Sequence, residues 1–213
     1  MEKVQLLLRQ HVGAPCAPCV AVGDKVKKGT LIATPTGLGA NIFSSVYGEV
    51  SEILEDRIVI KADAEQPDEF VPIDVPEDAS KLDMIKAAGI VGMGGAGFPT
   101  GIKLNIDLSA TEQGEFREDI NPELPKDFKL EHSYILINDS ECEPGLAHNI
   151  KQTIEQTDKV IRGVKYCMEI TKADKAIFAI KKKNREAVLA LLDALKDEEN
   201  ISVHLLPDIY PMG

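Results

Sequence analysis

The first third of the chain alternates apolar and polar residues over short stretches that are separated by Gly, Pro and Asp. Alternation with a period of two is typical of half-buried β-strands, and the separating residues favour turns. We therefore expect an all-β module in residues 1–63, with strands at 3–9, 19–23, 30–35, 44–53 and 57–63.

An acidic stretch with several prolines, residues 64–80, follows the β-module. It has no apolar periodicity, which suits a linker or a wrapping arm between two folded units. We place the boundary near Pro72 and expect two domains, the β-module at 1–72 and a second domain at 73–213.

The second domain is predicted to alternate helices with strands. Its first helix is expected to begin at a capping Ser80 or Asp78 and to end at Gly89. After a Gly-rich loop, the apolar periods predict strands at 133–140, 175–182 and 201–207, with helices between them at 149–170 and 184–196. Short connections in this order indicate an α/β fold, a parallel sheet with right-handed crossovers whose ligands bind at the carboxyl ends of the strands.

Composition restricts the kinds of partner that the chain can have. The 24 basic and 35 acidic residues give a net charge of -11, which would repel a phosphate backbone and excludes nucleic acid as an expected partner. No stretch approaches the roughly 20 apolar residues that span a membrane, and the charged N-terminus does not resemble a signal peptide. We therefore expect a cytoplasmic protein without direct membrane insertion.

The 4 cysteines are too few and too scattered for a disulfide framework, so reduced thiols are expected. Cys16 and Cys19 form a Cys-x-x-Cys, which can be half of a metal site, a redox pair with a reversible disulfide, or an ordinary turn. The sequence lacks the second Cys-x-x-Cys that a zinc or iron–sulfur site would require. No metal site is predicted.

Residues 22–35, followed by 44–53, resemble the biotinyl/lipoyl-like barrel-sandwich fold, in which glycine turns join two facing half-sandwiches. A carrier domain of this kind presents a lysine for acylation at the tip of a hairpin. The corresponding tip here, GLGANIF at 37–43, has no lysine. The resemblance therefore implies a β-module that docks onto another structure, and not a swinging arm.

The most distinctive motif is the Gly-rich segment GIVGMGGAGFPTGIKLN at 89–105. Glycine permits positive φ and a close approach to the backbone, and it leaves amide N–H groups that can bind an anion. The segment follows a helix and not a strand, which excludes the dinucleotide-binding pattern, and no Gly-Lys-Ser/Thr closes it as in a P-loop. An ordinary tight loop is the structural alternative.

Together with ILINDSECEPG at 135–145, this segment resembles the flavin site shared by the NADH-binding flavoprotein of respiratory complex I and the RnfC protein of the Rnf complex. The β-module at its N-terminus points to the Rnf branch, whose relatives include cobalamin reductases and proline-reductase-associated electron-transfer proteins. The resemblance implies an electron-transfer subunit that oxidises NADH through FMN. Electrons would pass to iron–sulfur centres and then to a redox partner, such as ferredoxin, membrane Rnf subunits or a reductase.

The resemblance assigns three groups of residues to a site for FMN and NADH. Backbone contact with the flavin falls to Gly94, Gly95, Ala96 and Gly97, with Phe98 as a pocket wall and Lys103 near the phosphate or ribityl oxygens. Asn138 and Ser140 would bind the polar edge of the flavin ring, and Glu141 and Glu143 would line the nicotinamide pocket. The structural alternative is that Lys103 and the two glutamates are solvated surface charges. No catalytic side chain is assigned.

Some features depart from this family pattern. Ser140 replaces an acid of the complex I flavoprotein, and Cys142 replaces a small residue, as is familiar in the Rnf branch. Gly145 is closer to the complex I version, whereas the Cys-x-x-Cys favours the proline-reductase-associated branch. Family members continue with a ubiquitin-like domain and iron–sulfur segments, so we expect a fragment that is peripheral to a membrane complex. A non-catalytic docking scaffold is the alternative function.

Overall fold

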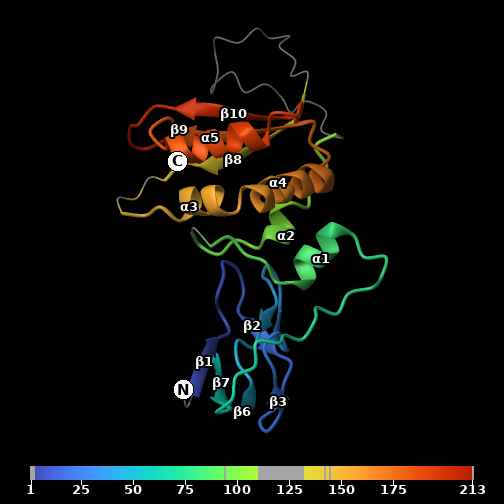
Figure 1. The fold of residues 1–213 in the computed structure, drawn as a ribbon. Coiled ribbons are helices and arrows are strands. Elements are labelled where there is room, and N and C mark those ends of the chain that lie inside the picture. Colours follow the sequence, from blue (N-terminus) through green and yellow to red (C-terminus); the bar gives the residue numbers. More distant parts are fainter. Residues whose placement is uncertain (1–2, 94, 110–131, 142, 144, 213) are drawn as a thin grey trace. The chain divides into compact units, whose positions relative to one another are not determined.

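The structure, a computed structural model, describes residues 3–93, 95–109, 132–141, 143 and 145–212. The chain divides into two compact units, Met1–Asn105 and Ile106–Gly213, and each is described by itself (Figure 1). Residues 73–105, which the sequence assigns to the second domain, belong by their contacts to the first unit. The first unit therefore contains both the β-module and the Gly-rich segment.

The β-module consists of two antiparallel sheets, which confirms the predicted barrel-sandwich. One sheet has the strand order β1-β7-β6-β3 and the other β2-β4-β5. The strands are β1 (Lys3–Leu7), β2 (Cys16–Pro18), β3 (Lys25–Val26), β4 (Leu31–Pro35), β5 (Ile42–Phe43), β6 (Gly48–Ile53) and β7 (Arg57–Ala62). Their inward-facing residues form one apolar core, in which Ile32, Val50, Ile58 and Ile60 are fully buried.

The predicted strand at 19–23 is wrong. The strand of this region, β2, lies earlier, and residues 21–24 form a turn. The Asp24 carboxylate accepts a hydrogen bond from the Ala21 N–H at 2.7 Å, and Gly23 has a φ of +96°. An aspartate that bonds to the nearby backbone competes with strand pairing, so the apolar run bends where its alternation predicts an extended strand.

Helix α1 (Lys81–Ala87) begins and ends as the sequence predicts. Ser80 is the N-cap: its hydroxyl accepts from the Asp83 N–H at 3.1 Å, and the Asp83 carboxylate accepts from the Ser80 N–H, which completes a capping box. Gly89, at a φ of +64°, ends the helix in the left-handed conformation that favours glycine. A single helical turn, α2 (Thr100–Lys103), follows the Gly-rich loop.

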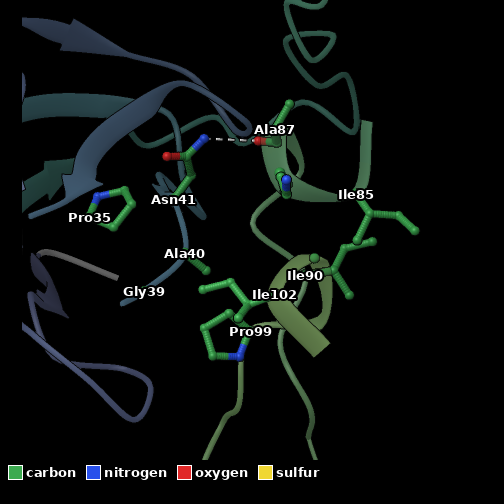
Figure 2. A pocket seen from close by; sticks show the side chains of 11 residues that line it. Pro35, Gly39, Ala40, Asn41, Ile85, Ala87, Ile90, Pro99 and Ile102 are labelled. Carbon is green, nitrogen blue, oxygen red and sulfur yellow. Dashed lines mark hydrogen bonds between the residues drawn. The ribbon is translucent and has the colours of Figure 1, made fainter. Parts of the chain in front are cut away.

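The hairpin tip of the β-module lies against α1 and α2, as Figure 2 shows. The Asn41 side-chain amide donates to the Ala87 carbonyl at 3.0 Å, at the end of α1. Gly89 has no room for a side chain, because a Cβ there would lie 2.3 Å from the Asn41 carbonyl oxygen. A mostly apolar pocket of about 350 Å³ remains beside these contacts, lined among others by Pro35, Ala40, Ile85, Ile90, Pro99 and Ile102. The lysine-free tip is thus a docking element within its own unit.

The second unit is a parallel sheet with helices on one face, which confirms the predicted α/β fold (Figure 1). Strands β8 (Tyr134–Asp139), β9 (Lys175–Lys181) and β10 (Ile201–Leu206) pair in the order β10-β9-β8. The helices α3 (His148–Glu155), α4 (Thr157–Thr171) and α5 (Arg185–Ala194) contact one another. They pack on the face that carries Phe178 and Ile180, and Leu136, 72% exposed, lies on the opposite face. No helix of the described residues is long and apolar enough to cross a membrane.

The single helix predicted at 149–170 is two helices, with a break at Gln156. That residue leaves the helical conformation, with a φ of -136° and a ψ of 35°. The Thr157 hydroxyl donates to the Thr153 carbonyl at 2.6 Å, and a threonine that bonds back onto the preceding turn bends a helix. Apolar residues on both sides of the break pack against the same core, so the apolar period hides the break.

Candidate functional site

The Gly-rich loop of the first unit is a narrow hairpin that is tied to the β-module. The Gly92 N–H donates to the Phe98 carbonyl at 2.9 Å, which closes residues 93–97 into a loop. The Ala96 carbonyl accepts from the Val12 N–H at 2.9 Å, which fixes the loop to the segment before β2. A pocket of about 450 Å³ is lined from both sides, by Gln10, His11, Val12, Val91, Gly92, Met93, Gly95, Ala96 and Gly97.

Two glycines of this loop have different reasons to be glycine. Gly97 is required by the fold, because its φ is +68° and a Cβ would lie 3.0 Å from the Gln10 carbonyl oxygen. Gly95 is not, because its φ lies outside the left-handed region and a Cβ would meet no atom within 4 Å. The backbone at Gly95 is therefore open to the close approach of a ligand. Gly94 and Cys142 lie outside the described residues.

The loop also carries hydrogen-bond donors and, beyond it, a positive charge. The amides of Gly95, Ala96 and Gly97 have no hydrogen-bond partner within the described residues. Adjacent N–H groups of this kind suit an anion or the oxygens of a ligand. Phe98 is 42% exposed beside them, and Lys103 is exposed at the end of α2, without an ion-pair partner in the described part of the chain.

Sequence reasoning missed His11, which holds the segment that anchors the loop. Its imidazole is buried, and Nε2 accepts a hydrogen bond from the Ala40 N–H at 3.1 Å. The Cys16 Sγ lies 3.4 Å from the same nitrogen. Ala40 belongs to the hairpin tip and is far from His11 in the sequence, so no local pattern signals this contact. His11 thus connects the hairpin tip to the segment that contains Val12.

Cys16 and Cys19 are free thiols with different surroundings. The buried Cys16 thiol donates to the Ala40 carbonyl at 3.3 Å, whereas the exposed Cys19 thiol donates to the Leu31 carbonyl at 3.6 Å. Burial raises the pKa of the Cys16 thiol, which lowers its thiolate fraction and its reactivity. Among the residues that the structure describes, no cluster of three potential metal ligands exists. An ordinary structural role fits these contacts better than a redox pair or a metal half-site.

The second group of predicted site residues lies at the carboxyl end of β8. Asn138 is exposed, and its Oδ1 accepts from the Ser140 N–H at 3.1 Å, which turns the chain. Ser140 is buried, and its hydroxyl has no hydrogen-bond partner among the described residues. Buried hydroxyl groups are nearly always bonded, so this one marks a place where a ligand could supply the missing partner.

The two predicted glutamates have different environments. The Glu141 Oε1 accepts from the Asn149 N–H at 2.7 Å and lies 3.5 Å from the His148 Nδ1, in the first turn of α3. A carboxylate in this position caps the helix and interacts favourably with its dipole. Glu143 is exposed, and its carbonyl accepts from the Leu146 N–H at 3.2 Å. Glu141 therefore has a structural partner, whereas the Glu143 side chain faces solvent.

Asp139, between Asn138 and Ser140, is a buried carboxylate that sequence reasoning missed. It faces the helices, where its Oδ2 accepts from the Thr153 hydroxyl at 3.0 Å. Burial raises the pKa of Asp139; the Thr153 hydrogen bond opposes this shift, and the charge of Glu141 adds to it. The polar end of the predicted strand was a signal for chemistry here, but not for which side chain is buried.

Asp139→Asn is expected to stabilise the protein at neutral pH relative to the natural chain. Because folding raises the pKa of Asp139, its favourable contribution is complete below the unfolded pKa, about 4, and is lost as the pH rises through the folded pKa. Asparagine keeps an oxygen for Thr153 and has no charge to bury. Urea unfolding of both proteins between about pH 4 and pH 7 should show the variant's advantage growing with pH. An advantage that shrinks with pH would contradict this assignment.

Two family models match the chain, and they meet near the predicted domain boundary. Residues 1–72 match the RnfC barrel sandwich hybrid domain, and residues 85–213 match the Nuo51 FMN-binding domain. The chain is 34% identical over 230 residues to the RnfC-type protein of the proton-translocating ferredoxin:NAD(+) oxidoreductase complex of Clostridium ljungdahlii. It is 30% identical over 228 residues to the corresponding protein of the Na(+)-translocating ferredoxin:NAD(+) oxidoreductase complex of Acetobacterium woodii.

These alignments cover 100% of the chain and 45% and 47% of the two relatives. The chain thus spans about half the length of the curated relatives that it matches. They confirm the resemblance to the Rnf branch that the two motifs and the β-module indicate. Because the FMN-binding model matches more than half of the chain, the chain belongs to the Nuo51 FMN-binding domain family, with an RnfC barrel sandwich hybrid domain in front.

Proposed function

We propose that this protein binds FMN and transfers electrons between NADH and a redox partner, as a peripheral part of an oxidoreductase complex. Its family is defined by an FMN-binding domain, and two relatives are subunits of ferredoxin:NAD(+) oxidoreductase complexes. FMN, when bound, supplies hydride acceptance and the release of single electrons. Since the chain spans about half of these relatives, NADH, ferredoxin and iron–sulfur centres outside these residues all belong to the proposal.

The observation that carries the proposal is the backbone at Gly95. The fold does not require glycine there, because a Cβ would meet nothing within 4 Å. The neighbouring amides of Ala96 and Gly97 have no partner within the described residues. An exposed backbone with free donors fits an acceptor-rich nucleotide such as FMN, whose ring and phosphate both accept hydrogen bonds.

The residues at the end of β8 fit the same ligand by their chemistry. The Ser140 hydroxyl is buried without a partner among the described residues, and Asn138 is exposed and keeps its side-chain amide group available. We assign both to hydrogen bonds with the polar edge of the flavin. Phe98 is assigned to a wall of the pocket and Glu143 to the nicotinamide side. Glu141 is assigned to the same side, where its bond to α3 would hold its carboxylate in one orientation.

A docking scaffold is the second candidate, and the hairpin tip favours it. The Asn41 bond to Ala87 and the close contact at Gly89 show that the β-module already serves as a docking element. In this alternative the Gly-rich loop supports the β-module and binds no flavin. The two functions differ in one measurable property, the affinity of the protein for FMN.

Titration of the full-length protein with FMN tests the proposal. We expect saturable quenching of the flavin fluorescence with one FMN per chain, and bleaching of the flavin absorbance when NADH is added without oxygen. Quenching without bleaching would leave FMN binding in place but remove NADH as the donor. A protein that quenches no FMN fluorescence would favour the scaffold.

Lys103→Ala is expected to weaken FMN binding about tenfold to a hundredfold, or roughly 1.5–3 kcal/mol. The reason is the loss of one charge-assisted hydrogen bond to a phosphate or ribityl oxygen. The measurement is the same fluorescence titration, at fixed ionic strength. Lys25→Ala removes an equal charge from the β-module, where Lys25 pairs with Glu49 at 2.8 Å, and should leave the affinity unchanged. Equal effects of both variants would indicate a general charge effect and not a contact of Lys103.

A further inference from the structure

Lys181 is a buried ammonium group at the carboxyl end of β9. The residue is 5% exposed, in contrast to the exposed Lys182 and the partly exposed Lys183 that follow it. Side chains alternate along a strand, so Lys181 lies on the face of the sheet opposite to Phe178 and Ile180. That face carries none of α3, α4 and α5, which pack on the Phe178 side. Lys181 is therefore not part of the core between helices and sheet.

Its charge is incompletely satisfied within the described residues. The Nζ of Lys181 lies 3.7 Å from the Asp208 Oδ1, which exceeds the length of a hydrogen bond. The same oxygen is only 2.8 Å from the Nζ of Lys183, whose side chain is 56% exposed. The pKa of Asp208 is lowered chiefly by Lys183, which agrees with Lys183 being its main partner. A buried ammonium needs a close acceptor, and Asp208 is committed elsewhere.

The strand register brings Lys181 to the residues already assigned to a ligand. Strands β8 and β9 pair in register up to Asp139 and Ile180, so Ser140 follows beside Lys181 at the same edge. Asp139 points to the helices through Thr153, and alternation therefore turns Asn138 and Ser140 to the face of Lys181. Among the described residues, this face thus gathers the unpartnered Ser140 hydroxyl and an incompletely paired ammonium.

We propose that Lys181 binds an anionic, oxygen-bearing group of the flavin nucleotide at the carboxyl edge of the sheet, next to Asn138 and Ser140. The inference rests on the proposed function and names a contact that the family resemblance does not assign. In open parallel sheets, ligands bind outside the carboxyl ends of the strands, which is where these three side chains lie. The Lys181 ammonium and the Ser140 hydroxyl are both donors, and a nucleotide oxygen supplies the acceptor that each of them lacks.

Two sources of such oxygens exist in FMN, the phosphate and the pyrimidine edge of the ring. Riboflavin has the ring without the phosphate, so comparing the two ligands separates the sources. A loss of affinity for both ligands would place Lys181 at the ring, where its charge would also raise the reduction potential of the flavin. A loss for FMN alone would place Lys181 at the phosphate.

The test uses the full-length protein with Lys181→Met, a substitution that nearly keeps the length of the side chain and removes its charge. We expect its affinity for FMN to fall about tenfold or more, measured by fluorescence quenching. The matched control is Lys183→Met, which removes the other lysine from the same Asp208 and should change the affinity by less than about twofold. Lys181→Arg keeps the positive charge and should retain most of the binding.

Two results would overturn the inference while the proposed function stands. One is natural protein and Lys181→Met binding both flavins equally well. The other is Lys181→Arg binding as weakly as Lys181→Met, because packing and not charge would then be responsible. Hydrogen exchange in β9 confirms that each variant is folded. Natural protein that binds neither flavin would overturn the proposed function, and this inference with it.

Discussion

Gly95→Val is expected to abolish FMN binding while the protein keeps its stability. A Cβ at this position meets no atom within 4 Å, so the unliganded fold can accept the larger side chain. The same side chain would occupy the space through which a ligand reaches the amides of the loop. We expect a loss of about a hundredfold or more, on the order of 3 kcal/mol, in a fluorescence titration with FMN.

Gly97→Val is the matched comparison on the same loop. Gly97 has a φ of +68°, and its Cβ would lie 3.0 Å from the Gln10 carbonyl oxygen. This variant should therefore lower the unfolding temperature of the first unit as well as flavin binding. If Gly95→Val bound FMN normally, the loop would be structural and the site assignment wrong.

Phe178→Ala is expected to destabilise the second unit by about 3–5 kcal/mol. Phe178 is fully buried in the middle of β9, in the core that the strands share with α4 and α5, and its loss leaves a cavity that the packed neighbours cannot fill. Hydrogen exchange of β9 and α5 amides, measured by mass spectrometry, reports the stability of this unit separately from the first one.

Leu136→Ala is the control for that substitution. Leu136 lies in the neighbouring strand but is 72% exposed, on the face opposite to Phe178. We expect a change of less than about 0.5 kcal/mol in the exchange free energy, as for other exposed positions. A cost as large as that of Phe178→Ala would show that the exposed face of the sheet is covered in the assembled protein.

Much of the fold could be predicted because it depends on neighbours in the sequence. The strands at 30–35 and 57–63 alternate with a period of two, and the Ser80 cap and Gly89 begin and end a helix through contacts a few residues away. The errors have the same local origin. Asp24 bends the run at 19–23 by a hydrogen bond that the apolar pattern does not record.

The candidate site was predictable only in outline. The sequence located the Gly-rich loop and the end of β8, because both depart from the surrounding periods, and the family resemblance gave them a ligand. It did not separate Gly95, which packing leaves open, from Gly97, which packing requires. It also treated Glu141 as a ligand residue, although its carboxylate bonds to the first turn of α3.

The sequence by itself determined the two folded parts, the order of most strands and helices, and the family to which the flavin motifs point. Only the tertiary structure decided which polar groups are buried and which are satisfied. His11 meets Ala40 from a distant hairpin, and Lys181 shares Asp208 with Lys183. Periods and caps act over a few residues, whereas burial and hydrogen bonding depend on partners that only folding brings together.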